Sequence, residues 1–428
     1  EVTVQAMAFL VQVVPIGTNI GLVRMLWVMV NGSFLQSRGA LFSALHLSSF
    51  TVREMRRSWA ALRYGVWEIN ELLEQWQMYV ESENQWRVRP YEGYQVVSVD
   101  ITGFWRPRLQ GWLGKHYHHL AQKALPAVVV GVIIISGQVG SHRIPLLRRI
   151  VRCQAQSSKP EFRCQLLREA AAQAALDRVI VVDAEFSIAE LQAADVPRYV
   201  VRLASNATAR RNQLPAYKGR GRYPQYGETV RPLPRKRQAH QIPATTPDQQ
   251  SHFDYQGRRI QISFWHGLVS VDTPAAAANL QHTFAIYVYA DPRYKQPLVL
   301  ATNLCLLPET AYLIYRDRWP VEQAPLAAKQ MIGLHRHFVF APETCFRLPE
   351  LGLLAGAILT YVAAVLPPIP SGFWDRSPQA TPGRLRRVLA QADFPNLAAF
   401  DPELRKKNAV TAHLPKGIDA HRRTKRAA

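Results

Sequence analysis

Two short apolar runs that each end in an aspartate constrain the fold of this chain more than any other sequence feature. The run QVVSVD ends at Asp100, and the run RVIVVD ends at Asp183. Runs of this length that are rich in valine and isoleucine are typical of buried strands. A carboxylate that terminates such a strand lies at the edge of a sheet, where open α/β sheets bind their ligands. We therefore expect both aspartates at a ligand-binding edge, although either could simply cap a turn.

Strand and helix patterns alternate along the middle of the chain, which favours an α/β core. The core strands are predicted at Tyr94–Ile101, Ala127–Ile135, Arg178–Val182 and Arg198–Leu203, with a helix at Glu161–Ala175. Residues 1–88 show apolar positions at helical spacing, and helical character returns at Pro308 and continues to about Leu366. Further strands are predicted at Arg258–Val271, Phe284–Tyr289 and Leu298–Thr302.

These patterns divide the chain into five regions. We expect a helical N-terminal DNA-binding region at 1–90, the first half of the core at 91–205, a β-rich basic insertion at 206–304, the helical second half of the core at 305–366, and a Pro-rich, basic C-terminal region at 367–428.

The charge of the chain predicts a polyanionic partner. Its 428 residues include 52 Lys and Arg but 31 Asp and Glu, a net charge of +21. Such an excess is typical of proteins that bind nucleic acid or an anionic membrane surface. No long, basic, amphipathic helix supports the membrane alternative. The four cysteines include no Cys-x-x-Cys pair, which argues against a zinc finger.

No membrane-spanning segment is expected. The run Leu351–Leu366 has about 16 residues, whereas a spanning helix needs about 20, so a buried core helix is favoured. The apolar start at Ala6–Ile16 lacks the basic flank and the cleavage site of a secretory signal. A cytoplasmic protein is the expectation.

Four residues that can bind phosphate or metal recur at helical spacing in YRDRWPVEQAPLAAK. Tyr315, Arg318, Glu322 and Lys329 are 3, 4 and 7 positions apart. On a continuous helix they fall within an arc of roughly 60°. Pro320 interrupts such a helix and more naturally opens a second one, with Glu322 in its first turn. Alternatively, the charged residues are ordinary exposed helix positions and Tyr315 belongs to the core.

Three carboxylates from two strand ends and one helix suit phosphodiester chemistry. Asp100, Asp183 and Glu322 together could hold two divalent ions about 3.5–4 Å apart, which neutralise the attacking and leaving oxygens of an in-line displacement. Oxygen ligands favour Mg²⁺ or Mn²⁺. Arginine, lysine and tyrosine beside them would hold the phosphate oxygens.

The sequence at this point resembles the DDE transposases of bacterial insertion sequences, in the branch with a Tyr-Arg-Glu-Lys signature. Tyr315, Arg318, Glu322 and Lys329 match its spacing throughout, and VSVDITGFW resembles the segment of the first acid. The segment VVDAEF resembles that of the second acid, except that Glu185 replaces a glycine.

The resemblance covers roughly residues 92–366 and implies an RNase H-like core, two Mg²⁺ (or Mn²⁺) ions and cut-and-paste transposition. It also implies a homodimer on paired transposon ends in a prokaryotic cytoplasm, and a β-rich insertion between the second and third acids. In this branch a tryptophan of the insertion can stack on a flipped base. Trp265 is the candidate here, and the alternative is a buried tryptophan on the insert's sheet.

Two basic regions are the expected DNA contacts. The first is the run from Arg210 to Arg237, in which tyrosines are interleaved; basic residues with aromatic neighbours are typical of nucleic-acid surfaces. Its candidate contacts are Arg210, Arg211, Lys218, Arg220 and Arg222. The second is a helix after Thr51 that carries several arginines and resembles the reading helix of a helix-turn-helix. A helical bundle with a solvated basic face is the alternative there.

The function predicted from the sequence is that of a transposase that cuts the ends of its element and joins them to target DNA. The alternatives are a non-catalytic or domesticated DNA-binding protein and a metal-dependent nuclease without strand transfer.

Overall fold

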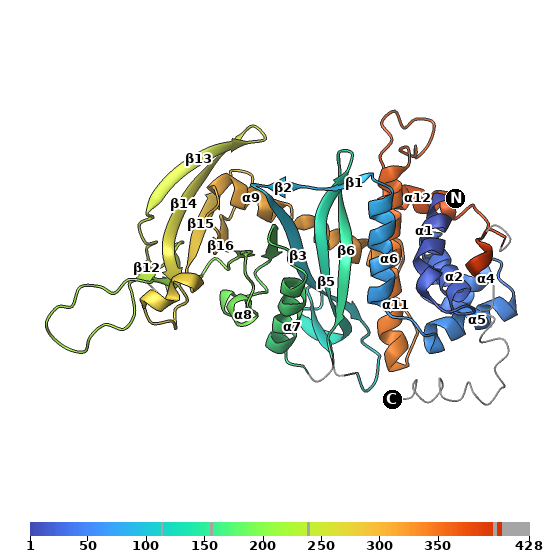
Figure 1. Ribbon diagram of the computed structural model, residues 1–428, viewed down its shortest axis with the longest axis horizontal. Coiled ribbons are helices and arrows are strands. Elements are labelled where there is room, and N and C mark those ends of the chain that lie inside the picture. Colours follow the sequence, from blue (N-terminus) through green and yellow to red (C-terminus); the bar gives the residue numbers. More distant parts are fainter. Residues whose placement is uncertain (113, 155–156, 238–239, 397–399, 405–428) are drawn as a thin grey trace. The chain divides into compact units, whose positions relative to one another are not determined.

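The structure is a computed structural model that describes residues 1–112, 114–154, 157–237, 240–396 and 400–404. The chain divides into two compact units (Figure 1). Unit 1 comprises Glu1–Val88, Ile101–Gln156 and the chain from Pro320 onward, and unit 2 comprises Arg89–Asp100 and Ser157–Trp319. Each unit contains helices and strands, so the expected mixed α/β class is confirmed. The basic runs at 405–407 and 421–426 lie outside the described residues.

The N-terminal part of unit 1 is helical, as the sequence predicts. Its helices are α1 (Val2–Leu10), α2 (Asn19–Val30), α3 (Ser33–Gln36), α4 (Leu41–Leu47), α5 (Val52–Tyr64) and α6 (Ile69–Ser82). Thr51 caps α5 in a capping box with Glu54, which satisfies two backbone donors at the helix start. Helix α5 packs closely on α2 because Gly21 has no side chain: a Cβ there would lie 2.5 Å from the Cβ of Ala61.

Two long strands, β5 (Lys123–Val139) and β6 (His142–Arg152), and several shorter segments form the β part of unit 1. The shorter segments are β1 (Trp86–Val88), β4 (Lys115–His118) and the second part of β3 (Tyr94–Trp105). Strand β5 pairs antiparallel with β1, β4 and β6. The strand predicted at Ala127–Ile135 lies within β5, and its apolar side chains are buried.

The C-terminal helices of unit 1 differ from the continuous helix expected up to Leu366. A 3-10 turn at Trp319–Glu322, α10 (Gln323–Leu326) and a π-helical turn at Ala327–Met331 precede α11 (Pro342–Val365) and α12 (Pro382–Leu389). Residues 332–341 are not helical. The expectation was wrong there because Gly333 has a φ of +91°, a left-handed conformation that ends helices.

Helix α11 is long and apolar enough to cross a membrane by length and composition, but 89% of its most apolar window is buried inside the protein. This agrees with the core helix favoured above. The helix carries Glu350, whose side chain is completely buried. Arg152, at the end of β6, binds it through two hydrogen bonds of 2.6 and 2.8 Å and also contacts Glu343 at 3.0 Å. Burial alone would lower the pKa of Arg152, but these carboxylates outweigh that effect and raise it.

The segment before α11 contains a buried histidine with an unusual pKa. His337 is 2% exposed, and its Nδ1 lies 3.1 Å from the carbonyl oxygen of Leu334. Burial, reinforced by the positive charge of Arg106, lowers the pKa of His337 to about 3. The folded protein therefore holds this ring neutral.

We expect this histidine to make the protein sensitive to mild acid. An unfolded histidine titrates near pH 6.5, so its contribution to stability is complete above that pH and is lost as the pH falls below it, because only the unfolded chain then takes up the proton. Between pH 6.5 and 5 the loss should reach up to about 2 kcal/mol. Urea denaturation at both pH values measures it. His337→Leu should reduce the dependence, whereas substitution of the exposed His252 should leave it unchanged.

Unit 2 is built on a mixed sheet. It contains the first part of β3 with β7 (Arg178–Val182), β8 (Tyr199–Arg202), β16 (Leu298–Thr302), β15 (Phe284–Ala290), β14 (Arg258–Val269), β9 (Ala209–Arg211) and β10 (Thr229–Val230), in that order. Strands β3, β7 and β8 are parallel, and β8, β16, β15, β14, β9 and β10 pair antiparallel. Strand β13 (Gln249–Tyr255) pairs with β14, and β2 (Pro90–Tyr91) with β3.

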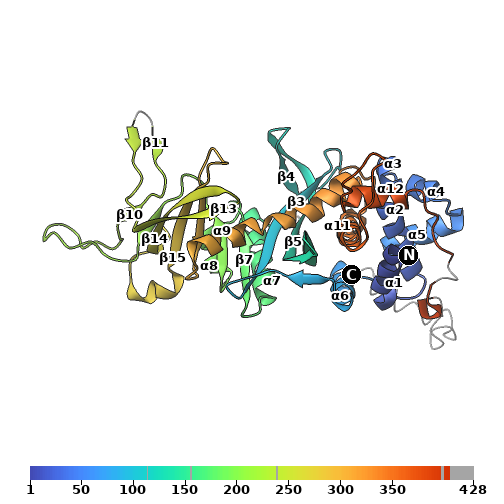
Figure 2. The same cartoon turned by 90° about the horizontal axis from the view of Figure 1, so that it is seen from above.

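Three helices and a separate hairpin complete unit 2. The helices are α7 (Lys159–Ala172), α8 (Ile188–Ala193) and α9 (Pro308–Arg316), and the hairpin joins β11 (Arg235–Arg237) to β12 (His240–Ile242). Figure 2 shows this hairpin projecting from the sheet of unit 2. Helix α9 is anchored on the sheet because the Tyr312 hydroxyl donates a 2.9 Å hydrogen bond to Asp291, which also pairs with Arg258 at 3.0 Å. This anchor fixes the end of α9.

Candidate active site

The two strand-end aspartates lie at the same level of the sheet in unit 2. Parallel pairing aligns Gln95 with Arg178 and continues to Ser98 with Val181. Continuing this register by two residues brings Asp100 level with Asp183. Neighbouring strands are about 4.8 Å apart, and residues at one level point to the same face. This register favours a position of the two carboxylates beside each other, and their joint action as a site remains a prediction.

The strands that carry the two aspartates are buried on both faces. Val96, Val179 and Val181 are completely buried in the core of unit 2, and Val99, Ile180 and Val182 between them are completely buried as well. Burial on both faces is typical of parallel strands. Both aspartates follow the buried segment and are half-buried themselves. Half-buried carboxylates remain accessible to a ligand while water is partly excluded.

A short turn after β7 holds Asp183 in place. Its Oδ1 accepts a 2.9 Å hydrogen bond from the backbone N–H of Glu185. Ser187 then caps α8 in a capping box with Glu190, and Arg163 binds Glu190 at 2.7 Å. Desolvation and then the negative charge of Asp183 raise the pKa of Glu185. Glu185, which stands where the resembled pattern has a glycine, is therefore harder to ionise beside Asp183.

The first two residues of the signature lie in the last turn of α9 and just after it. Tyr315 is half-buried in its last turn, and the guanidinium of Arg318 lies 5.7 Å from the centre of the Tyr315 ring. Arg318 is 7% exposed. The next-door Asp317 lies 3.8 Å from Arg89. The structure thus brings Tyr315 and Arg318 together, but phosphate binding by this largely buried arginine remains a prediction.

The other two signature residues belong to unit 1. Glu322 is exposed at the end of the 3-10 turn, so Pro320 does introduce a new helical segment with Glu322 in its first turn. Lys329 lies in the π-helical turn, a feature often found at functional sites. Its Nζ donates a 2.7 Å hydrogen bond to the hydroxyl of Thr102 and lies 4.7 Å from the ring centre of Trp105.

The contact of Lys329 with β3 is a feature that sequence reasoning missed. Thr102 follows Asp100 by two positions on one strand, so the two side chains point to the same face. That spacing in VSVDITGFW was the available signal. Lys329 is therefore fixed to the strand that carries the first acid.

The donor set fits a magnesium site in part. Mg²⁺ is commonly held by one or two carboxylates together with substrate phosphate, and the aligned aspartates supply two. Among the described residues, no group of three His, Cys, Asp or Glu side chains is gathered to hold a metal. Because Glu322 and the aspartates belong to different units, a joint site of three carboxylates with two ions remains a prediction.

The arginines predicted to bind DNA in the insertion fall into two groups. Arg210 donates hydrogen bonds of 2.8 and 3.1 Å to the carbonyls of Val271 and Gly227. Arg211 forms a bidentate ion pair with Asp248. Both arginines therefore hold the sheet edge together. The second group, Lys218, Arg220 and Arg222, is exposed on the loop between β9 and β10.

Trp265 is buried on β14, in the sheet of unit 2. It is 1% exposed, and its indole N–H donates a 2.9 Å hydrogen bond to the carbonyl of Thr246. This position matches the alternative stated for it, a core tryptophan, and leaves no open ring face for a base. We do not include Trp265 in the proposed DNA surface.

Helices α4 and α5 of unit 1 are joined by a short turn. The turn Ser48–Phe50 includes Ser49 in the left-handed region, with a φ of +61°. The buried face of α5 consists of Ser58, Ala61 and Leu62. Its exposed face carries Arg53, Arg56, Arg57 and Arg63. A capped helix with an open arginine stripe is suited to phosphate contact, and a solvated face remains the alternative.

Comparison with protein-family models found no match, and comparison with curated proteins found no matching protein. The family resemblance therefore rests on the motifs in this chain.

Proposed function

We propose that this protein is a DNA transposase of the DDE type. The observation that carries the proposal is the common level of Asp100 and Asp183 on adjacent parallel strands. The signature Tyr315, Arg318, Glu322 and Lys329 in the sequence supports it, as does the net charge of +21. A sheet edge with paired carboxylates on a strongly basic protein suits phosphoryl transfer on nucleic acid.

In this proposal Asp100, Asp183 and Glu322 would hold two Mg²⁺ or Mn²⁺ ions, which supply charge neutralisation at the attacking and leaving oxygens. The chain positions the scissile phosphate between these carboxylates. Water attacks the phosphorus, the bond to the 3′ oxygen breaks, and a 3′-hydroxyl is released. That hydroxyl then attacks the phosphorus of a phosphodiester in the opposite strand or in target DNA, the bond from this phosphorus to its own 3′ oxygen breaks, and a new 3′-hydroxyl is released.

The basic side chains have separate tasks. Lys329, oriented by Thr102, neutralises a phosphate oxygen beside the first acid. Tyr315 and Arg318 hold further phosphate oxygens near the metal ions. The arginines of α5 and the exposed basic loop of the insertion bind the terminal inverted repeats. Two protomers act on paired ends in the prokaryotic cytoplasm, as in the family that the motifs resemble.

Strand cleavage tests the proposal. The full-length protein is incubated with duplexes that carry the DNA flanking its own gene, in Mg²⁺, Mn²⁺ or EDTA. We expect metal-dependent nicks at defined positions and, with added target DNA, joined products. Binding at the ends without cleavage in either metal would favour the non-catalytic DNA-binding protein. Cleavage that never yields joined products would favour the nuclease.

A further inference from the structure

The loop between β9 and β10 contains a basic segment with an unusual alternation. Between Tyr217 and Tyr223 the sequence reads KGRGR, and we call Tyr217–Tyr223 the basic arm. Its glycines, Gly219 and Gly221, have φ values of +75° and +83°. No atom lies within 4 Å of the place where a Cβ would be at either glycine. The arm is thus thin between its three cationic side chains.

Two tyrosines close the basic arm. The rings of Tyr217 and Tyr223 stack at 4.0 Å with an angle of 18°. The Tyr217 hydroxyl donates a 2.9 Å hydrogen bond to the carbonyl of Gly221. These contacts limit the conformations of the arm before it binds anything. Less conformational entropy is then lost on binding, which favours affinity.

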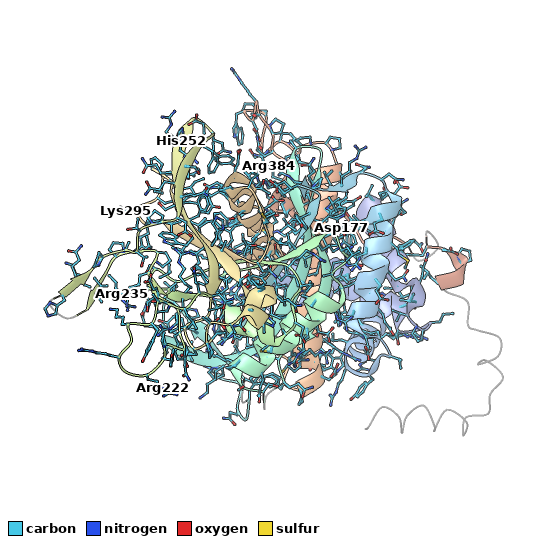
Figure 3. The ribbon with its side chains drawn as sticks, turned by 60° about the vertical axis from the view of Figure 1, so that its left-hand side comes forward. Asp177, Arg222, Arg235, His252, Lys295 and Arg384 are labelled. Carbon is cyan, nitrogen blue, oxygen red and sulfur yellow. The ribbon has the colours of Figure 1, made fainter. Side chains whose placement is uncertain are left out.

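The cations of the basic arm are open to a ligand. Lys218, Arg220 and Arg222 are exposed, and none makes a hydrogen bond or an ion pair with a residue that the structure describes. Figures 1 and 2 show the loop extending from the sheet of unit 2, and in Figure 3 Arg222 lies at its outer edge. The neighbouring Arg210 and Arg211 already bind groups within unit 2. In this loop the cations that can bind a ligand are therefore those of the basic arm.

The small cross-section of the basic arm determines which groove of duplex DNA it can enter. The major groove is about 12 Å wide and admits a helix or a two-stranded ribbon, whereas the minor groove is about 6 Å wide. A segment with glycine at every second position suits the narrower groove. A·T tracts narrow the minor groove further and strengthen its negative potential, which attracts arginine. In G·C pairs the guanine N2 amino group projects into that groove.

We propose that the basic arm enters the minor groove of A·T-rich duplex DNA and places Arg220 and Arg222 along its floor. This inference rests on the proposed function only in taking duplex DNA as the partner. It adds a mode of recognition that reads groove width and the absence of the guanine amino group. Phosphate contact alone would carry no such preference.

Base analogues make the test sharp. An inosine·cytosine pair has the minor groove of A·T but the major groove of G·C, because it lacks the guanine amino group. The full-length protein is titrated in EDTA against three labelled duplexes that differ only in an A·T, I·C or G·C block, and fluorescence anisotropy gives the affinities. We expect A·T and I·C duplexes to bind similarly and roughly tenfold or more tightly than G·C.

Two variants assign the preference to the arm. R220A/R222A should bring the affinities for all three duplexes to the G·C level. Arg259→Ala is the matched control, because Arg259 is an exposed arginine elsewhere in unit 2 whose partner, Asp254, is also exposed. It should keep the preference.

Three results would overturn the inference. They are equal binding of all three duplexes by the wild type, a preference for A·T that I·C does not share, and an R220A/R222A variant that weakens every duplex equally. The assay contains no metal, so its outcome is independent of catalysis. A groove preference in a protein that never cleaves DNA would support the arm while refuting the transposase, and cleavage without the preference would do the reverse.

Discussion

Asp100→Asn and Asp183→Asn will each reduce metal-dependent strand cleavage by on the order of a thousand-fold, and the double variant will be no slower than either single variant. The reason is that the register of β3 and β7, continued by two residues, brings the two aspartates to one level. Two carboxylates that hold the same ions act as one group, so removal of either already abolishes the arrangement. Single-turnover cleavage of a labelled duplex, with DNA binding measured in parallel, gives the four rates.

Asp195→Asn is the matched control for this experiment. Asp195 is exposed in unit 2 with a φ of +52°, a conformation that asparagine also tolerates. We expect the control to cleave at the wild-type rate. If the losses of the two aspartate variants simply add, the two groups act independently and the paired site proposed above is wrong.

Arg152→Leu will lower the free energy of unfolding by about 3–5 kcal/mol, the second large effect that we expect. The substitution leaves Glu350 completely buried on α11 without the two short hydrogen bonds that neutralise it. An uncompensated buried charge is far more costly than the absence of the whole pair. Urea denaturation of the full chain, followed by circular dichroism, measures the loss.

The double variant Arg152→Leu/Glu350→Leu separates charge from packing. It should recover most of the lost stability, because no charge is then left buried. Glu343 remains neutralised in this variant, since Arg347 still binds it at 2.9 Å. A double variant as unstable as Arg152→Leu would show that leucine cannot be packed at these positions and that burial of charge is not the cause.

Regular apolar runs made part of the fold predictable. Strands β7 and β16 begin and end at the residues predicted, because each is a short apolar run bounded by polar residues or proline. Strand β6 was not predicted: in HRIPLLRRIVR apolar and basic residues come in pairs, so the two-residue period of a half-buried strand is absent. Arg152, at the end of β6, binds Glu350, which lies nearly 200 positions later in the sequence. Only the tertiary structure brings these two residues together.

The candidate site was predictable to the same degree. The aspartates could be placed at a sheet edge from their own strands, but their equal level depends on how β3 pairs with β7, which appears only in the folded structure. The internal roles of Arg210 and Arg211 were not predictable, because their partners are mainly backbone carbonyls and Asp248 in another strand connection. The stack of Tyr217 on Tyr223 likewise appears only once the glycines turn the chain.

The division of the chain into interleaved segments has a consequence for synthesis on the ribosome. Unit 1 takes residues from the start of the chain, from its middle and from Pro320 onward. Helices α1–α6 therefore leave the ribosome about 250 residues before α11, against which α1, α2 and α6 pack, a delay of roughly 12–50 s at bacterial or slower elongation rates. During this interval their apolar faces lack a permanent cover, whereas unit 2 can close earlier. We therefore expect chaperones to bind the helices α1–α6 of the nascent chain until α11 has been synthesised.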